Sequence, residues 1–72
     1  MDRARDNGIL KTYDPIKGYG FATREKGKDI FVFYADFTEK KSEATAIAGT
    51  VIEFDVEITG KGPRARNIVI IS

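Results

Sequence analysis

The chain has 72 residues, the length of one small domain, and its 12 lysines and arginines nearly balance its 11 acidic residues, at a net charge of +1. It contains no cysteine and no histidine, which excludes disulfide bonds and thiolate metal sites and removes the commonest general base. We therefore predict no catalytic residues, no metal site and no cofactor.

Residues 1–7 are charged and lack the apolar stretch of a signal peptide, so we expect a flexible tail there and the folded domain at 8–72. No segment is apolar over a length that would span a membrane. We expect a cytoplasmic protein with no membrane partner.

Five segments alternate residue types with the period of two that is typical of β-strands. They cover roughly 9–13, 19–24, 29–33, 50–58 and 65–71. Turn residues separate neighbouring segments, and we expect one short helical turn near 34–37 before a long irregular connection. Short strands without a long helix predict an all-β fold, and a closed five-stranded antiparallel barrel would leave no free sheet edge.

The segment at 50–58 shows the clearest alternation. Its apolar residues are expected to face the core: Ile52, Phe54, Val56 and Ile58. The acidic residues between them are expected to face solvent: Glu53, Asp55 and Glu57. Three acidic residues of the long connection are expected to be solvated rather than to bind a metal ion: Asp36, Glu39 and Glu43.

Two aromatic runs are the most informative part of the chain. Residues 17–22 read KGYGFA, and residues 30–34 read IFVFY. Because successive side chains of a strand point to opposite sides, Tyr19 and Phe21 share one side of the first strand. Phe31 and Phe33 share one side of the second strand for the same reason. Each run therefore has one aromatic side and one side of small or aliphatic residues.

Two arrangements fit this pattern. If the aliphatic residues Ile30 and Val32 lie in the core, four rings are exposed, and a soluble monomer rarely exposes such a patch without a function. If instead the aromatic side of each strand faces inward, an inversion of this parity, the rings form the core. Gly18 and Gly20 leave little to pack on the opposite side, which favours exposed rings. Lys17 then indicates nucleic acid, because bases stack on rings and lysines hold phosphates. Residues 17–21 also match the first five places of the aromatic RNA-binding octapeptide.

The order and spacing of four segments resemble the bacterial cold-shock domain. They are GILK at 8–11, KGYGFA at 17–22, DIFVFY at 29–34 and KGPRARN at 61–67. The resemblance covers roughly residues 8–69, and the two aromatic runs look like the two ribonucleoprotein motifs of that family. It implies an OB-fold barrel that binds single-stranded RNA or DNA with little sequence preference. We expect a monomer that acts as an RNA chaperone, holding RNA unpaired without ATP.

The resemblance, with the charged positions beside it, places the nucleic-acid-binding residues at Lys11, Tyr13, Lys17, Tyr19, Phe21, Phe31, Phe33, Tyr34, Lys61, Pro63, Arg64 and Arg66. The rings are expected to stack on bases, and the cations to neutralise phosphates.

The chain departs from the family at three positions in or beside the quoted segments and in the long connection. Thr12 stands where the family usually has Trp, Phe33 where it has His, and Ala35 where it often has Ser. Residues 38–46 also lack the aromatic residue usual in that loop. Loss of the Trp leaves a rival hypothesis open, a degenerate barrel that uses its aromatic patch as a protein-interaction module. The acidic strand argues against a third hypothesis, a ribosome- or polymerase-associated accessory barrel.

Overall fold

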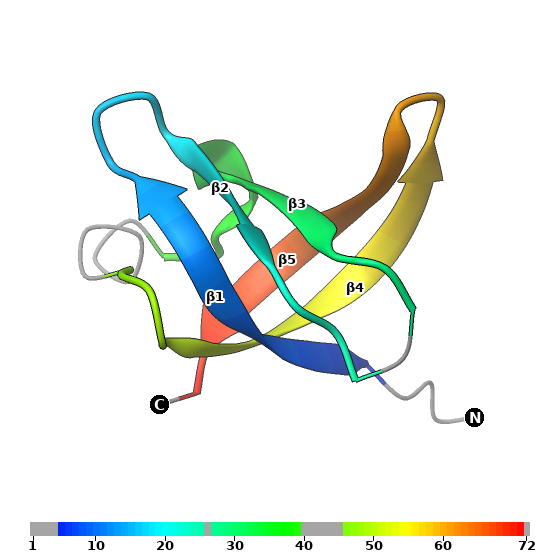
Figure 1. Ribbon diagram of the computed structural model, residues 1–72, viewed down its shortest axis with the longest axis horizontal. Helices are drawn as coiled ribbons and strands as arrows, with labels where there is room; N and C mark the ends of the chain where they lie inside the picture. The colour runs from blue at the N-terminus through cyan, green and yellow to red at the C-terminus, as the bar shows by residue number, and fades with distance from the viewer. Residues whose placement is uncertain (1–4, 26, 40–45, 72) are drawn as a thin grey trace.

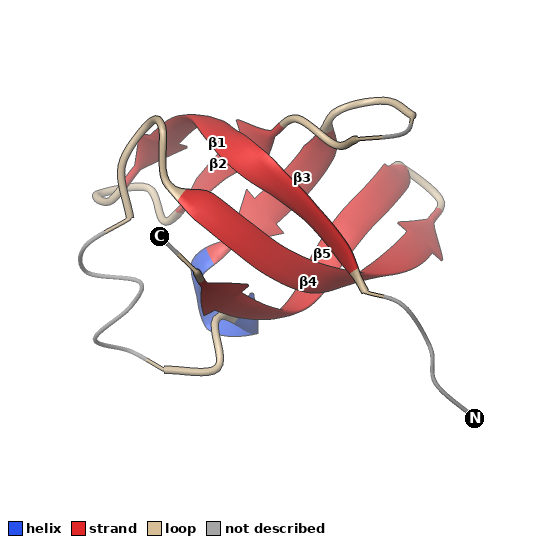
Figure 2. Ribbon diagram, turned by 90° about the horizontal axis from the view of Figure 1, so that it is seen from below, coloured by secondary structure: helices blue, strands red, loops and turns tan. Residues whose placement is uncertain are grey.

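Within residues 5–25, 27–39 and 46–71, the part of the chain that the computed structural model describes, the alternating segments form five strands (Figure 1). They are β1 (Asp6–Asp14), β2 (Tyr19–Ala22), β3 (Ile30–Phe33), β4 (Val51–Thr59) and β5 (Gly62–Ile70). One turn of 3-10 helix, η1 (Tyr34–Asp36), follows β3 directly, as the sequence predicts. Figure 2 shows this turn, in blue, beside the strands. The all-β fold is confirmed.

The strands close into a barrel in the order β1-β2-β3-β5-β4. Pairing is antiparallel between β1 and β2, β1 and β4, β2 and β3, and β4 and β5. The β3–β5 pair is parallel, with Phe31 opposite Arg64, so the prediction of a wholly antiparallel barrel is corrected at this seam. Parallel neighbours need a crossover connection of at least about a dozen residues, and residues 34–61 provide one.

The core consists of the inward-facing side chains of all five strands. Its fully buried large residues are Leu10, Ile30, Val32, Ile52, Phe54 and Ile68. Ala22 and Ala65 are also fully buried, and Phe37, just after η1, is 7 % exposed. Because Ala22, Ile30 and Val32 have no exposed surface, the aliphatic side of both aromatic runs faces inward. The predicted parity is confirmed, and the inverted arrangement is excluded.

Gly20 allows β1 and β2 to approach each other closely. A Cβ atom at this residue would lie 2.1 Å from the carbonyl oxygen of Thr12 and 2.7 Å from the Cα of Tyr13. Gly18 has a positive φ of 80°, and a Cβ there would lie 2.7 Å from the ring of Tyr34. Both glycines of the KGYGFA run are therefore needed to set the spacing behind and beside the exposed rings.

Several boundaries and burial states differ from the sequence expectations. Strand β2 ends at Ala22 rather than at 24, and β5 begins at Gly62 rather than at 65. Strand β1 begins at Asp6, which pairs with Phe54, so Asp6 and Asn7 belong to the barrel rather than to the expected tail; residues 1–4 lie outside the described residues. Ile58 is 76 % exposed, because it lies one residue before the end of β4, beside the β4–β5 turn. Asp36 is 8 % exposed rather than solvated; Glu39 is exposed, and Glu43 lies outside the described residues.

Candidate nucleic-acid interface

Strands β2 and β3 present four aromatic side chains on the outer side of the barrel, and the first residue of η1 adds a fifth. We call this set the aromatic face: Tyr19, Phe21, Phe31, Phe33 and Tyr34. Tyr19 is directly opposite Phe33 and Phe21 is directly opposite Phe31 in the β2–β3 pair. Cross-strand partners point to the same side of a sheet, so the two strands together determine the face.

The rings of the aromatic face contact one another in a continuous row. Phe31 lies at its centre, with ring centroids 5.9 Å from Tyr19, 5.7 Å from Phe21 and 6.2 Å from Phe33. The planes of Phe31 and Phe33 are only 18° apart. Tyr34 continues the row at 4.8 Å from Phe33. These spacings are those of interacting aromatic pairs, which hold each ring in a fixed orientation.

The outer rings of this row remain accessible. Tyr19, Phe21 and Tyr34 are 39 %, 44 % and 42 % exposed, whereas Phe31 and Phe33 are half-buried by their neighbours. An exposed, contiguous apolar surface of this kind usually marks a binding site. Its flat, preorganised rings are suited to planar aromatic ligands such as nucleobases.

Tyr13, which the sequence analysis placed at the binding surface, lies on the other side of β1. It is half-buried against the core, with its ring edge-on to Phe37 at 6.0 Å. An irregularity in the β1–β2 register between Leu10 and Thr12 changes the alternation here, so Leu10 and Tyr13 both face inward. The exposed position opposite Phe21 is instead Thr12.

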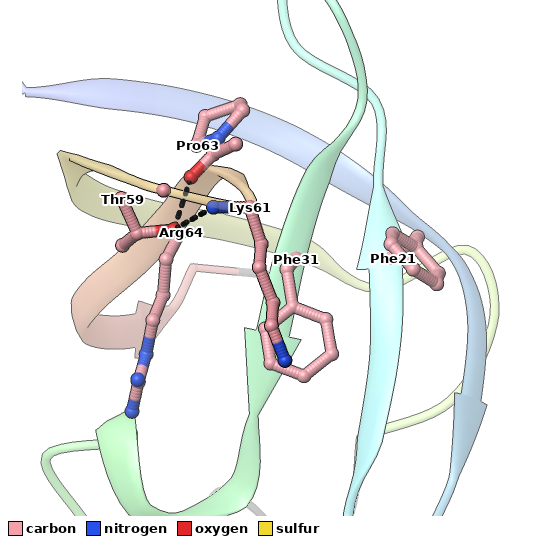
Figure 3. A pocket seen from close by; sticks show the side chains of 8 residues that line it. Phe21, Phe31, Thr59, Lys61, Pro63 and Arg64 are labelled. Atoms are coloured by element: carbon pink, nitrogen blue, oxygen red, sulfur yellow. Dashed lines mark hydrogen bonds between the residues drawn. The ribbon is translucent and has the colours of Figure 1, made fainter.

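A cleft of about 750 Å³ separates the aromatic face from the β4–β5 turn (Figure 3). Phe21 and Phe31 line it from the aromatic face, and Lys61, Pro63 and Arg64 line it from the β4–β5 turn and β5. The turn is fixed by Thr59, whose hydroxyl donates to the carbonyl of Gly62 at 2.7 Å and accepts from the Lys61 amide at 3.2 Å. The turn therefore presents Lys61 beside the rings.

The three predicted lysines have different surroundings. Lys17, in the β1–β2 turn, is exposed two residues before Tyr19, and Lys61 is exposed in the turn that lines the cleft with Phe21 and Phe31. The turn that carries Lys17 is ordered by Asp14, whose carboxylate accepts from the amides of Ile16 and Lys17 at 2.9 and 3.2 Å. Lys11 instead forms an exposed ion pair with Asp29, at 2.8 Å between Nζ and Oδ2.

The two predicted arginines converge on one carboxylate, which the sequence analysis did not anticipate. Arg64 and Arg66 project from the same side of β5, and both oxygens of Asp36 accept from their Nε groups, at 2.8 and 2.9 Å. Arg64 also lies over the ring of Phe33, with its guanidinium carbon 5.5 Å from the centroid. Arg66 in addition binds Glu57 at 2.7 Å. Hydrogen bonding to Glu57, with the charges of Asp36 and Glu57, raises the pKa of Arg66 above its ordinary value.

The acidic side of β4 is also paired. Arg5 lies 3.8 Å from a carboxylate oxygen of Glu53 and 3.3 Å from one of Asp55. Asn67 donates to Asp55 at 3.0 Å. These contacts offset the negative charge of β4 on its own side of the barrel, away from the β2–β3 surface.

Comparison with known proteins gives one family. The family model described as "'Cold-shock' DNA-binding domain" matches residues 6–71. The "Retron Se72 cold shock-like protein" of Salmonella heidelberg is 40 % identical over 60 residues, which are 83 % of this chain and 90 % of that protein. A "Cold shock-like protein" of Thermotoga maritima is 36 % identical over 64 residues, 89 % of this chain and 96 % of that protein. A protein with the same description in Aquifex aeolicus is 40 % identical over 65 residues, 89 % and 91 % of the two chains.

Proposed function

The chain belongs to the cold-shock domain family, and on this basis we propose that it binds single-stranded RNA or DNA through the aromatic face. The observation that carries the proposal is the continuous row of rings across β2 and β3, which lies on the outer side of these strands, opposite the buried residues Ala22, Ile30 and Val32. Bases must be unstacked from their neighbours before they can stack on protein rings, so this surface favours single strands over duplexes.

The affinity would come from two sources. Stacking on an aromatic ring contributes about 1–3 kcal/mol per base and tolerates any base, since every base has a flat face. The exposed lysines Lys17, in the turn before β2, and Lys61, in the turn across the cleft, would neutralise phosphates of a strand that binds on the aromatic face. Neither source reads base edges, so the proposed binding has little sequence preference.

Binding of this kind accounts for the proposed RNA chaperone activity without a catalytic residue or a cofactor. A protein that binds only unpaired nucleotides shifts the equilibrium of a weak hairpin towards its open form, as any ligand shifts an equilibrium towards the state that it binds. The shift is limited by the difference between the affinities for the open and the paired form, so only marginally stable hairpins would open.

In the part of the chain that the structure describes, no helix is long and apolar enough to cross a bilayer.

A titration with fluorescently labelled heptathymidine, a uridine-rich RNA heptamer and the matching DNA duplex tests the proposal. We expect both single strands to bind at least about tenfold more tightly than the duplex at the same salt concentration. Equal or tighter binding to the duplex would contradict the proposal. Opening of a weak RNA hairpin that carries a fluorophore and a quencher, in the absence of ATP, tests the chaperone activity separately.

The rival function, a barrel that docks a protein on the aromatic face, makes a different prediction in the same titration. A protein-docking surface has no reason to distinguish unpaired nucleotides from paired ones. Absence of binding to any of the three oligonucleotides would favour this rival, since the rings would remain exposed without a nucleic-acid ligand.

A further inference from the structure

Asp36 is an unusual residue to find buried beside a binding surface. Its side chain is 5 % exposed, and its Oδ2 and Oδ1 atoms lie 2.8 and 2.9 Å from the Nε atoms of Arg64 and Arg66. A buried ion pair adds little net stability over well-packed apolar residues, because both ions lose their hydration. The role of Asp36 is therefore better explained by how it positions the two arginines.

Arg64 extends the aromatic face towards β5. Its guanidinium lies over Phe33, and Phe33 is stacked on Phe31 with an interplanar angle of 18°. Arg64 is also among the residues that line the cleft with Phe21 and Phe31 (Figure 3). A guanidinium is planar and stacks on bases much as an aromatic ring does. The row of flat groups thus runs from Phe31 through Phe33 to Arg64.

The charge of Arg64 is compensated before any ligand binds. Two arginines, Arg64 and Arg66, face two carboxylates, Asp36 and Glu57, in one connected cluster. A phosphate that approached Arg64 would compete with a buried carboxylate 2.8 Å from its Nε. Competition of this kind does not apply to Lys17, which is exposed in the β1–β2 turn.

We propose that Asp36 is a positioning residue that holds Arg64 beside Phe33 as a charge-compensated stacking plane for a nucleobase. The proposal rests on the proposed function, because it takes an unpaired base as the ligand. The contribution of Arg64 to the binding of a base then depends on its planar guanidinium and on the contact of its Nε with Asp36. Lysine has neither property, and its charge alone cannot replace them.

The test is a titration of heptathymidine across a series of salt concentrations with four proteins: wild type, Arg64→Gln, Arg64→Lys and Lys17→Gln. We expect Arg64→Gln and Arg64→Lys to weaken binding equally, by about tenfold at every salt concentration, with the slope of log K against log salt unchanged. Lys17→Gln, the matched control for a phosphate contact, reduces the magnitude of the slope by about 0.7. Rescue of binding by Arg64→Lys, or a slope change for Arg64→Gln like that for Lys17→Gln, would overturn the proposal.

Asp36→Asn tests the positioning residue itself. Release of Arg64 makes it available to phosphate, so we expect the slope to become steeper by about 0.7, and high-salt binding to weaken as stacking is lost. A purely structural role would lower the unfolding temperature and leave the slope unchanged, which would contradict the proposal. If Asp36→Asn does not fold, the affinity of Arg64→Lys relative to wild type tests the proposal instead. Failure of the wild-type chain to bind would remove the proposed function as well, whereas wild-type binding with full rescue by Arg64→Lys overturns only this inference.

Discussion

Phe31 and Val32 are adjacent in β3 but have opposite environments: Val32 has no exposed surface, whereas Phe31 lies on the outer side of the barrel among the rings of Tyr19, Phe21 and Phe33. Val32 therefore belongs to the core, and its direct neighbour in the chain, Phe31, belongs to the proposed binding surface. Substitution of each in turn therefore measures the two roles independently.

We predict that Phe31→Ala weakens binding of single-stranded DNA by about 1–3 kcal/mol and changes stability much less, because it removes the central ring of the aromatic face. Val32→Ala should lower the free energy of unfolding by about 2 kcal/mol, since it removes two buried carbon atoms and leaves a cavity. Denaturant unfolding and oligonucleotide titration of both variants check this. Unfolding by Phe31→Ala together with a silent Val32→Ala would contradict the assignment of the two sides.

Gly20→Ala should destabilise the barrel by about 3 kcal/mol or more, because the new methyl group would lie 2.1 Å from the Thr12 carbonyl oxygen and would force β1 and β2 apart. Gly60→Ala is the matched control, since a Cβ at that residue has no atom within 4 Å. We expect the control to change stability by less than about 1 kcal/mol. Thermal unfolding of both variants measures the difference, and equal stabilities would mean that the strands are not held at this spacing.

Thr12→Trp should strengthen binding, because Thr12 is exposed directly opposite Phe21 and a ring there would enlarge the aromatic face. One additional stacked base is worth about 1–3 kcal/mol, so we expect a gain in affinity of at least about fivefold. Asn7→Trp adds the same ring to the same strand at an exposed position that pairs with β4, and should leave the affinity unchanged. The natural chain contains no tryptophan, so quenching of the new fluorophore by the oligonucleotide reports stacking directly. Similar gains from both variants would point to a nonspecific effect of the ring.

The ion pairs of the structure lower the expected salt dependence. The five predicted cations would support a slope of about −2 to −3.5 if three to five of them bound phosphates, at roughly 0.7 per phosphate. Arg64 and Arg66 are held by the buried Asp36, whereas Lys17 and Lys61 are exposed and Lys11 can exchange its exposed partner Asp29 for a phosphate. We therefore predict two to three phosphate contacts and a slope of about −1.4 to −2.1. A measured slope near −3.5 would mean that the arginines leave Asp36 when the ligand binds.

The features that could be predicted from the sequence depend on local alternation. Period-two patterns located all five strands of the described chain, and the same parity correctly placed Ile30 and Val32 in the core and the rings outside. Predictions from alternation were wrong where burial depends on the extent of the core or on the register between strands. Ile58 continues the apolar pattern of β4 past the end of the core, and a register irregularity in β1 directs Tyr13 inward.

Long-range pairing could not be predicted in this way. The parallel β3–β5 contact and the convergence of two arginines on Asp36 join residues that are 28 or more positions apart in the chain. The sequence does contain a partial signal, because Arg64 and Arg66 flank the buried Ala65 and must share the outer side of β5. The pattern does not reveal which strand or turn packs beside that side of β5. It therefore does not reveal which carboxylate the two arginines contact.

The central claim, that the aromatic face is the nucleic-acid interface, is tested most directly by NMR chemical-shift mapping of the labelled protein titrated with heptathymidine. We predict that the largest shifts occur in the ring and amide signals of β2 and β3, with a second group in the β4–β5 turn that forms the cleft. The outer side of β4 near Glu53 and Asp55 should remain unchanged. Saturable binding with shifts concentrated on that side of β4, and with the rings of Phe21 and Phe31 unaffected, would contradict the account.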